Sequence, residues 1–229
     1  MTKTVLVTGA TRGIGLKFAE HYVKLGWNVI AAARDPSNAE NLASLSPYKI
    51  VKLDSSNEAS IVSVASQLDG EPIDVLINNA GILFRDDLVS TTKEDLLKTF
   101  EVNSVGPFLV TRAFLPHLKL AVAQHGSASV VQISSQLGSI ERNLTGKLYS
   151  YRASKAAVNM INSSLAVDLK GESIAAVVIH PGYVATDMNS HQGTISAETS
   201  VAGIASVIDK LMLADSGKFF DYAGESLPW

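Results

Sequence analysis

The chain has 229 residues, of which 46% are hydrophobic and 18% are charged, a composition typical of a packed globular protein rather than a disordered one. The formal net charge of −3 argues against the overall basicity of proteins that bind nucleic acid or anionic membranes. The sequence contains no cysteine, which excludes disulfides, thiolate nucleophiles and metal sites with cysteine ligands.

Short apolar runs alternate with amphipathic stretches along the chain, without a linker, charge block or internal repeat. Strands are predicted at residues 4–7, 28–32, 49–53, 75–77, 129–133, 175–179 and 218–220. Helical patterns begin near Ile14 and after Asn57, and continue at residues 92–100, 106–123, 149–169 and 198–211. Strands that alternate with helices pair in parallel through right-handed crossovers. The sequence therefore predicts an α/β fold, a single Rossmann-type domain over residues 1–229, with a doubly wound parallel sheet of about seven strands and helices on both faces.

The N-terminal segment lacks the features of a signal peptide, and no run of about 18 apolar residues suggests a membrane span. We therefore expect a cytoplasmic protein that binds neither membranes nor nucleic acid. None of the five histidines has metal-ligand spacing to another histidine or to a carboxylate cluster, so no metal site is expected.

The first predicted strand runs into a glycine-rich segment, Thr8-Gly-Ala-Thr-Arg-Gly-Ile-Gly15, which opens a helix. Glycine permits a sharp turn and lets backbone N–H groups approach a pyrophosphate, while the helix N-terminus adds partial positive charge. At the first strand–helix junction of an α/β chain this loop predicts a dinucleotide site, with a simple tight turn as the alternative. The expected contacts are Gly9, Arg12, Gly13, Ile14 and Gly15.

The end of the second predicted strand indicates which dinucleotide binds. An acidic residue there would bind the ribose 2′-hydroxyl of NAD, whereas the 2′-phosphate of NADP needs cations. Arg34 stands beside the acidic position and Arg12 lies in the glycine loop, so two guanidinium groups favour NADP(H). Asp35 is the counterargument, unless it starts a turn with Pro36.

Tyr151 and Lys155 are four residues apart in a helical stretch and therefore share one face. A phenol beside an ammonium group has its phenolate stabilised, which predicts a tyrosine pKa lowered toward neutrality. Such a tyrosine can donate a proton to a carbonyl oxygen or accept one from an alcohol. Taken alone, the spacing is more often that of an ordinary surface helix.

Several motifs follow one another in the order of a known family: the glycine loop, Asn78-Asn-Ala-Gly81, Asn103, Ile133-Ser-Ser135, Tyr-x3-Lys155 and His180-Pro-Gly182. Together they resemble the short-chain dehydrogenase/reductase family over nearly the whole chain. The C-terminal residues 220–229 and the form Ser-Tyr-Arg-Ala-Ser-Lys are similar to the sniffer-type carbonyl reductase and C-factor-like branch.

The resemblance implies four catalytic residues. Tyr151 would donate the proton in reduction, and Lys155 would bind the nicotinamide ribose and lower the tyrosine pKa. Ser135 would bind the substrate carbonyl oxygen, and Asn103 would hold a water that connects Lys155 to solvent. Ser135 is favoured over Ser134 because the family's serine is followed by x-x-Gly, here Gly138.

Further cofactor contacts are implied in the same way. Asp54 would accept a hydrogen bond from the adenine amino group, with a helix cap as the alternative. Asn79 and Gly81 would lie beside the adenine ribose, although a polar turn closed by glycine explains them almost equally well. The segment after the sixth strand would hold the nicotinamide carboxamide through Pro181, Gly182, Val184 and Thr186.

The spacing between Ser135 and Tyr151 is sixteen residues, longer than in much of the family. We expect the extra loop, residues 139–148, to bulge over the substrate pocket, with Leu83 and Phe84 nearby. Residues 186–200 are expected to form a lid over the substrate.

The favoured function is the NADPH-dependent reduction of a small carbonyl compound, an aldehyde, ketone or quinone. The alternatives are a regulatory or signalling protein of the C-factor type and an NAD-dependent alcohol dehydrogenase. A second apolar face on the helices at 106–123 and 149–169 suits a homodimer, as in much of the family.

Overall fold

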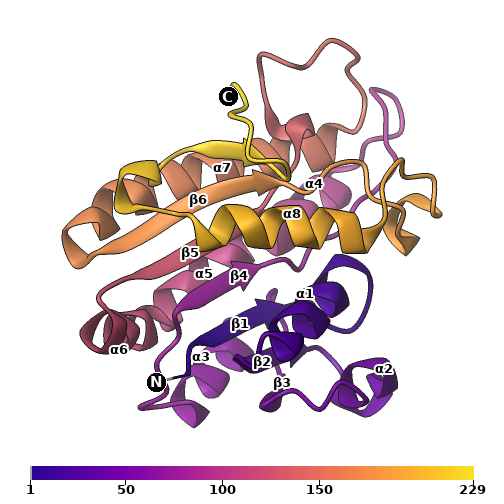
Figure 1. Ribbon diagram of the computed structural model, residues 1–229. Coiled ribbons are helices and arrows are strands. Elements are labelled where there is room, and N and C mark those ends of the chain that lie inside the picture. Colours follow the sequence, from indigo (N-terminus) through magenta and orange to yellow (C-terminus); the bar gives the residue numbers. More distant parts are fainter. Residues whose placement is uncertain (1) are drawn as a thin grey trace.

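The computed structural model, which describes residues 2–229, contains a seven-stranded parallel sheet in the order β3-β2-β1-β4-β5-β6-β7 (Figure 1). The predicted doubly wound fold is confirmed, and each predicted strand end lies within one residue of the observed end. The strands are β1 (Thr4–Thr8), β2 (Asn28–Ala33), β3 (Lys49–Lys52), β4 (Val75–Asn78), β5 (Ala128–Ile133), β6 (Ile174–His180) and β7 (Phe219–Asp221).

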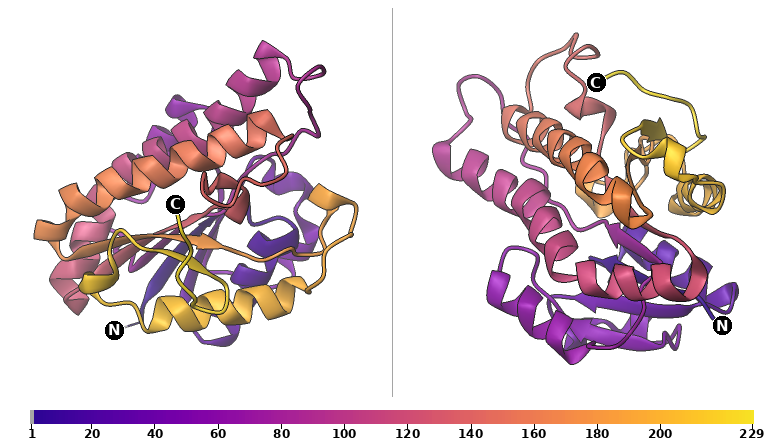
Figure 2. Two further views of the ribbon diagram at one scale, coloured as in Figure 1. Left: turned by 90° about the horizontal axis from the view of Figure 1, so that it is seen from above. Right: turned by 90° about the vertical axis from the view of Figure 1, so that its left-hand side faces the viewer.

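Helices cover both faces of the sheet (Figure 2), because alternate strand residues point to opposite sides and both sides are apolar. Val5 and Val7 pack with Phe18 of α1 and Ile204 of α8, whereas Leu6 packs in the cluster formed by α3, α5, α6 and α7. The helices are α1 (Gly13–Lys24), α2 (Glu40–Ala43), α3 (Glu58–Gln67), α4 (Lys93–Phe100), α5 (Gly106–Ala113), α6 (Leu115–His125), α7 (Tyr149–Leu169) and α8 (Ala197–Asp209).

The helix predicted over residues 106–123 is not continuous. The stretch predicted as a single helix over 106–123 is divided at Phe114 into α5 and α6. Pro116 lies in the first turn of α6, where its missing N–H would have been unpaired anyway, so the chain restarts the helix there instead of continuing it. A π-helical turn, Glu101–Val105, also precedes α5 and was not predicted.

The strand order reverses direction between β1 and β4, which are neighbours in the sheet although β2 and β3 come between them in the chain. In open parallel sheets, ligands bind outside the carboxyl ends of the strands at this point. The loops that follow β1, β4, β5 and β6 therefore lie together at the carboxyl ends of the strands. Among residues 2–229, no helix combines the length and the apolar character needed to cross a bilayer.

Candidate active site

A groove of about 640 Å³ lies at the carboxyl ends of the strands. Most of the residues predicted to contact a cofactor line this groove: Gly9, Arg12, Gly13, Ile14, Gly15, Arg34, Asp54, Asn79, Gly81, Tyr151, Lys155, Pro181 and Thr186. Two predicted contacts are not among its lining residues. A Cβ on Gly182 would meet the side chains of Ile195 and Tyr222, and Val184 is buried.

The glycine loop has the geometry that the sequence suggested. Gly9 and Gly13 have positive φ angles of 66° and 53°, which side chains rarely adopt. A Cβ on Gly15 would lie 2.1 Å from the carbonyl oxygen of Gly9, so only glycine fits at this crossing. The first turn of α1 carries no side-chain cap and no acidic residue. Its backbone N–H groups can therefore bind an anion, and the loop fits a pyrophosphate.

Asn79, which follows β4, holds the glycine loop that follows the neighbouring strand β1. Its side-chain nitrogen donates to the carbonyl oxygens of Thr8 (2.9 Å) and Gly9 (3.2 Å). In return, the Thr8 hydroxyl accepts hydrogen bonds from the backbone N–H groups of Asn79 (3.0 Å) and Ala80 (3.1 Å). The Asn-Asn-Ala-Gly segment thus holds the end of β1 in place.

Asp35 does start the turn with Pro36, as considered from the sequence. Its carboxylate accepts hydrogen bonds from the Ser37 N–H (3.1 Å) and the Asn38 side chain (2.5 Å). Hydrogen bonds from the side chains of Ser37 and Asn38 lower the pKa of Asp35. The carboxylate is therefore engaged locally, and the exposed Arg34 beside it lines the groove.

Asp54 caps no helix, because Asn57 caps α3. The Asp54 carboxylate instead accepts hydrogen bonds from the N–H (2.9 Å) and hydroxyl (2.7 Å) of Ser56. Burial opposes ionisation of this carboxyl, but the bonds from Ser56, together with the charges of Arg34 and Lys98, outweigh burial and lower its pKa. Lys98 also lines the groove. Nothing in the sequence marks Lys98 as a groove residue, because a lysine three residues before Glu101 is typical of an ordinary helix surface.

Arg12 reaches the segment after β6 instead of standing free beside Arg34. Its guanidinium lies 3.3 Å from a carboxylate oxygen of Asp187, whose other oxygen lies 3.0 Å from His191 Nε2. The Arg12 and Asp187 side chains are 73% and 52% exposed. Since exposed ion pairs contribute little, a phosphate can compete with Asp187 for Arg12.

Ser135 and Tyr151 come together from β5 and α7. The Ser135 hydroxyl caps a 3₁₀ turn (Gln136–Gly138) by accepting from the Leu137 N–H at 3.1 Å, and it lies close enough to the Tyr151 phenol to act on the pKa of that group. Ser134 points inward, where its hydroxyl donates to Asn159 Oδ1 at 2.7 Å. A Cβ on Gly138 would lie 2.7 Å from the backbone of Lys155, so glycine lets the serine turn pack against α7.

The charge state of the Tyr151–Lys155 pair differs from the sequence prediction. Lys155 Nζ donates to the carbonyl oxygen of Ile133 at 2.8 Å and lies 5.6 Å from the centre of the tyrosine ring. Burial raises the pKa of Tyr151 to about 12, against the opposing effect of Ser135, and burial lowers the pKa of Lys155 to about 8. The predicted lowering of the tyrosine pKa is therefore wrong, because desolvation outweighs an ammonium that bonds elsewhere.

Asn103 lies in the π-helical turn and is 1% exposed. Its side chain accepts from the Ile82 N–H (2.8 Å) and donates to the Ile82 carbonyl (2.9 Å) and to the Ser154 hydroxyl (3.0 Å). A Cβ on Gly81 would lie 3.2 Å from Asn103 Oδ1 and 3.7 Å from Lys155 Nζ. The fold therefore brings Asn103 close to Lys155. The Asn103 side chain is already hydrogen-bonded to the backbone of Ile82 and to the hydroxyl of Ser154.

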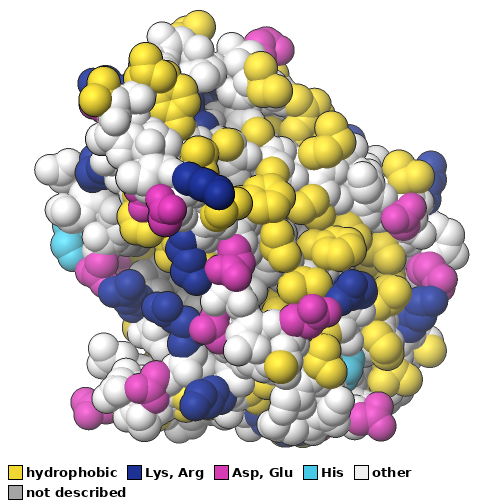
Figure 3. All heavy atoms as spheres, turned by 180° about the vertical axis from the view of Figure 1, so that it is seen from behind, with side chains coloured by type: hydrophobic (Ala, Val, Ile, Leu, Met, Phe, Trp, Pro, Cys, Tyr) yellow, Lys and Arg dark blue, Asp and Glu magenta, His cyan; other side chains and the backbone are white. Residues whose placement is uncertain are grey.

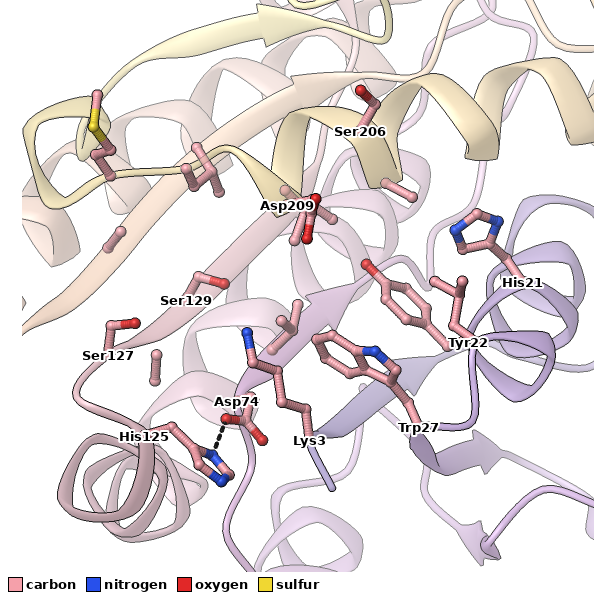
Figure 4. A pocket seen from close by; sticks show the side chains of 18 of the residues that line it. Lys3, His21, Tyr22, Trp27, Asp74, His125, Ser127, Ser129, Ser206 and Asp209 are labelled. Carbon is pink, nitrogen blue, oxygen red and sulfur yellow. Dashed lines mark hydrogen bonds and ion pairs between the residues drawn. The ribbon is translucent and has the colours of Figure 1, made fainter. Parts of the chain in front are cut away.

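A second cavity, of about 700 Å³, lies on the side of the molecule opposite the groove, at the amino ends of the strands (Figure 4). It contains Tyr22, Trp27 and a pair in which His125 Nδ1 lies 2.5 Å from Asp74. The other carboxylate oxygen of Asp74 accepts from the Thr4 N–H at 2.7 Å. Asp74 thus connects the start of β1 and the end of α6 to the start of β4, and none of the motif residues lines this cavity.

Comparison with known proteins agrees with this geometry. Residues 3–195 match the family model described as short chain dehydrogenase, and the chain belongs to this family. It is 43% identical over 159 residues to the C-signal protein of Myxococcus xanthus, in an alignment that covers 69% of this chain and 93% of that protein.

Two solved structures resemble the whole chain. The NADPH-bound carbonyl reductase from chicken fatty liver is 36% identical, with a TM-score of 0.92 over 100% of this chain and 99% of that one. The carbonyl reductase Sniffer of D. melanogaster is 32% identical, with a TM-score of 0.94 over 100% of both chains.

Proposed function

We propose that this protein is an NADPH-dependent reductase of small carbonyl compounds. The observation that carries the proposal is the meeting of Ser135, Tyr151 and Lys155 beside the groove that the glycine loop lines. The likeness to an NADPH-bound carbonyl reductase supports the choice of reaction and cofactor.

The groove fits NADP(H) better than NAD(H). The glycine loop and the uncapped start of α1 provide the pyrophosphate site. Arg34 lines the groove and would bind the 2′-phosphate, while the carboxylate of Asp35, which would repel that phosphate, is bound to Ser37 and Asn38. Of the other lining residues, Asp54 and Asn79 would contact the adenosine, and Pro181 and Thr186 would contact the nicotinamide.

A bound reduced nicotinamide supplies a hydride to the carbonyl carbon. Tyr151 supplies the proton: with a pKa of about 12 its phenol stays protonated at neutral pH and can donate to the carbonyl oxygen. The Ser135 hydroxyl donates to the same oxygen and stabilises its developing charge. Lys155, which carries a proton below its pKa of about 8, would bind the nicotinamide ribose.

The test is NADPH oxidation over a panel of aldehydes, ketones and quinones, compared with NADH. The wild-type protein should reduce members of the panel and prefer NADPH. Tyr151→Phe keeps the ring but removes the donor, so kcat should fall by ~10²–10⁴-fold while NADPH binding and thermal stability are retained. A Tyr151→Phe variant with wild-type kcat would overturn the mechanism.

A regulatory function is the second candidate, favoured by the 43% identity to the C-signal protein of M. xanthus. Under this alternative the protein would bind the dinucleotide but reduce no member of the panel. Retention of the serine, tyrosine and lysine in one site argues for catalysis.

Homodimerisation through helices α4 to α7 is part of the proposal. Hydrophobic side chains form a broad band on the rear face of the molecule (Figure 3). The exposed hydrophobic residues of these helices are Leu96, Leu97, Phe100, Phe108, Leu120, Tyr149, Met160 and Val167. Their concentration on one side suits an isologous contact between two copies.

A further inference from the structure

Arg152, the residue after Tyr151, donates hydrogen bonds to four different groups. Its Nε bonds to the carbonyl oxygens of Gly146 and Lys147, both at 3.1 Å. One terminal nitrogen bonds to the Leu137 carbonyl at 3.4 Å, and the other bonds to the Thr145 hydroxyl at 2.9 Å. A planar guanidinium with five donors can hold several acceptors at once, whereas a lysine cannot reproduce this fork.

These bonds join the two segments that flank the reacting groups. Leu137 belongs to the 3₁₀ turn that the Ser135 hydroxyl caps. Gly146 and Lys147 belong to the end of the 139–148 loop, and Arg152 itself stands in the first turn of α7 beside Tyr151. One side chain therefore connects the serine turn, the loop and the tyrosine helix.

The loop needs such support, because its last two residues have unfavourable backbone conformations. Lys147 and Leu148 have φ angles of 56° and 51°, which non-glycine residues adopt only where surrounding contacts enforce them. The Leu148 N–H donates to the Asp86 carbonyl at 2.8 Å, and the Asp86 carboxylate accepts from the Ser150 N–H at 3.1 Å.

The first half of the loop is held more lightly. Its Glu141 N–H donates to the carbonyl oxygen of Trp229 at 3.0 Å, and Figure 1 shows the loop rising next to the C-terminal end of the chain. Ile140 and Leu144 are 81% and 90% exposed. The loop thus presents apolar side chains to solvent from a backbone that is anchored mainly at its C-terminal half.

We propose that Arg152 is a positioning residue that holds the 139–148 loop as one wall of the carbonyl site, so that the protein favours carbonyl compounds with an extended apolar group. This inference rests on the proposed function. Without the guanidinium, residues 145–148 lose their contacts to α7 and to the serine turn, and the wall becomes mobile. Substrates long enough to reach the wall lose binding, whereas the reaction at the carbonyl group is unchanged.

The experiment compares the wild type with Arg152→Ala, Arg152→Lys and the control Arg142→Ala. Arg142 lies in the same loop, but its guanidinium makes a single hydrogen bond, to Gln136 at 3.3 Å. Amide hydrogen exchange is measured by mass spectrometry over residues 139–148. KM and kcat are measured with NADPH for straight-chain aldehydes from propanal to decanal, and NADPH affinity is measured by fluorescence.

In both Arg152 variants, exchange should speed up within the loop and stay unchanged in the sheet. KM for decanal should rise by about tenfold with kcat within about twofold, which is the pattern of lost binding rather than lost chemistry. KM for propanal and the affinity for NADPH should stay near wild-type values, as should all measurements on Arg142→Ala. Wild-type loop exchange and wild-type KM for decanal in Arg152→Lys would show that a positive charge alone holds the loop. That result would overturn the role assigned to the several hydrogen bonds of the guanidinium.

Wild-type exchange in Arg152→Ala, or an equal rise in KM for propanal and decanal, would overturn the inference. Failure of the proposed function looks different: the wild type would then reduce no aldehyde at all. In that outcome unchanged loop exchange in Arg152→Ala still refutes the positioning role, and faster exchange supports it.

Discussion

The side-chain nitrogen of Lys155 donates a 2.8 Å hydrogen bond to the carbonyl oxygen of Ile133, the last residue of β5. This bond fastens the N-terminal third of α7 to the end of β5, two residues before Ser135. It also holds the ammonium group inside the protein, where burial lowers its pKa from 10.5 to about 8.

Lys155→Met should therefore make the fold more stable at neutral pH while removing activity. The folded-state pKa lies below the unfolded value, so burying the charge costs stability below pH 8, and the cost disappears as the pH rises toward 10.5. We expect the variant to exceed the wild type by about 1–3 kcal/mol at pH 7 in denaturant unfolding, less at pH 10. Lys170→Met, at an exposed lysine, should show no such pH-dependent gain. A variant less stable than the wild type at pH 7 would contradict the prediction.

The pH profile of carbonyl reduction should fall on the alkaline side near pH 8. Tyr151 stays protonated up to about pH 12, so Lys155 is the first of the two groups to lose its proton. The rate should be level between about pH 6 and 7.5 and decline as the ammonium becomes neutral. Measurement of kcat at saturating NADPH from about pH 6 to 10 checks this. A rate that stays level over that whole range would rule out a role for the lysine charge.

Ser135→Ala should lower kcat by about 10²-fold or more, because it removes a donor to the developing oxyanion. Ser134→Ala is the matched control, because the Ser134 hydroxyl is already engaged as a donor to Asn159 inside the protein. We expect Ser134→Ala to lose stability with a much smaller loss of kcat, since its effect is the loss of one buried hydrogen bond. The reverse ranking in steady-state kinetics would mean that Ser134 is the catalytic serine.

Arg34→Asp should weaken NADPH binding by about tenfold to over a hundredfold, since a charge-assisted contact is worth roughly 1.5–3 kcal/mol and repulsion adds to its loss. NADH binding should change far less, because NADH has no 2′-phosphate. Isothermal titration with both dinucleotides measures the difference. Equal losses would show that Arg34 does not face the 2′-phosphate.

Light scattering should give twice the 24.3 kDa mass of one chain at micromolar concentration. Met160, 68% exposed on α7, is one of the exposed hydrophobic residues of helices α4 to α7, and Met160→Lys should convert the dimer to a monomer. Met212→Lys, at a similarly exposed methionine outside these helices, should leave the dimer intact. A wild-type mass of one chain would reject dimerisation.

The sequence by itself determined the fold and most of the groove. Buried parallel strands are continuous apolar runs, and glycine is favoured where a turn requires a positive φ. The strands, α7 and the loop at Gly9 to Gly15 can therefore be read from local residues. The motif order then brought Tyr151, Lys155 and Ser135 to one edge, because the carboxyl ends of parallel strands share it.

Only the tertiary structure decided what these side chains contact and which charges they carry. The tyrosine pKa is raised rather than lowered because burial depends on every segment packed around α7, not on the spacing of two residues. The pairing of Arg12 with Asp187 joins residues 175 positions apart. The four hydrogen bonds of Arg152 depend on the path of a loop with no periodic pattern, so no sequence rule could place them.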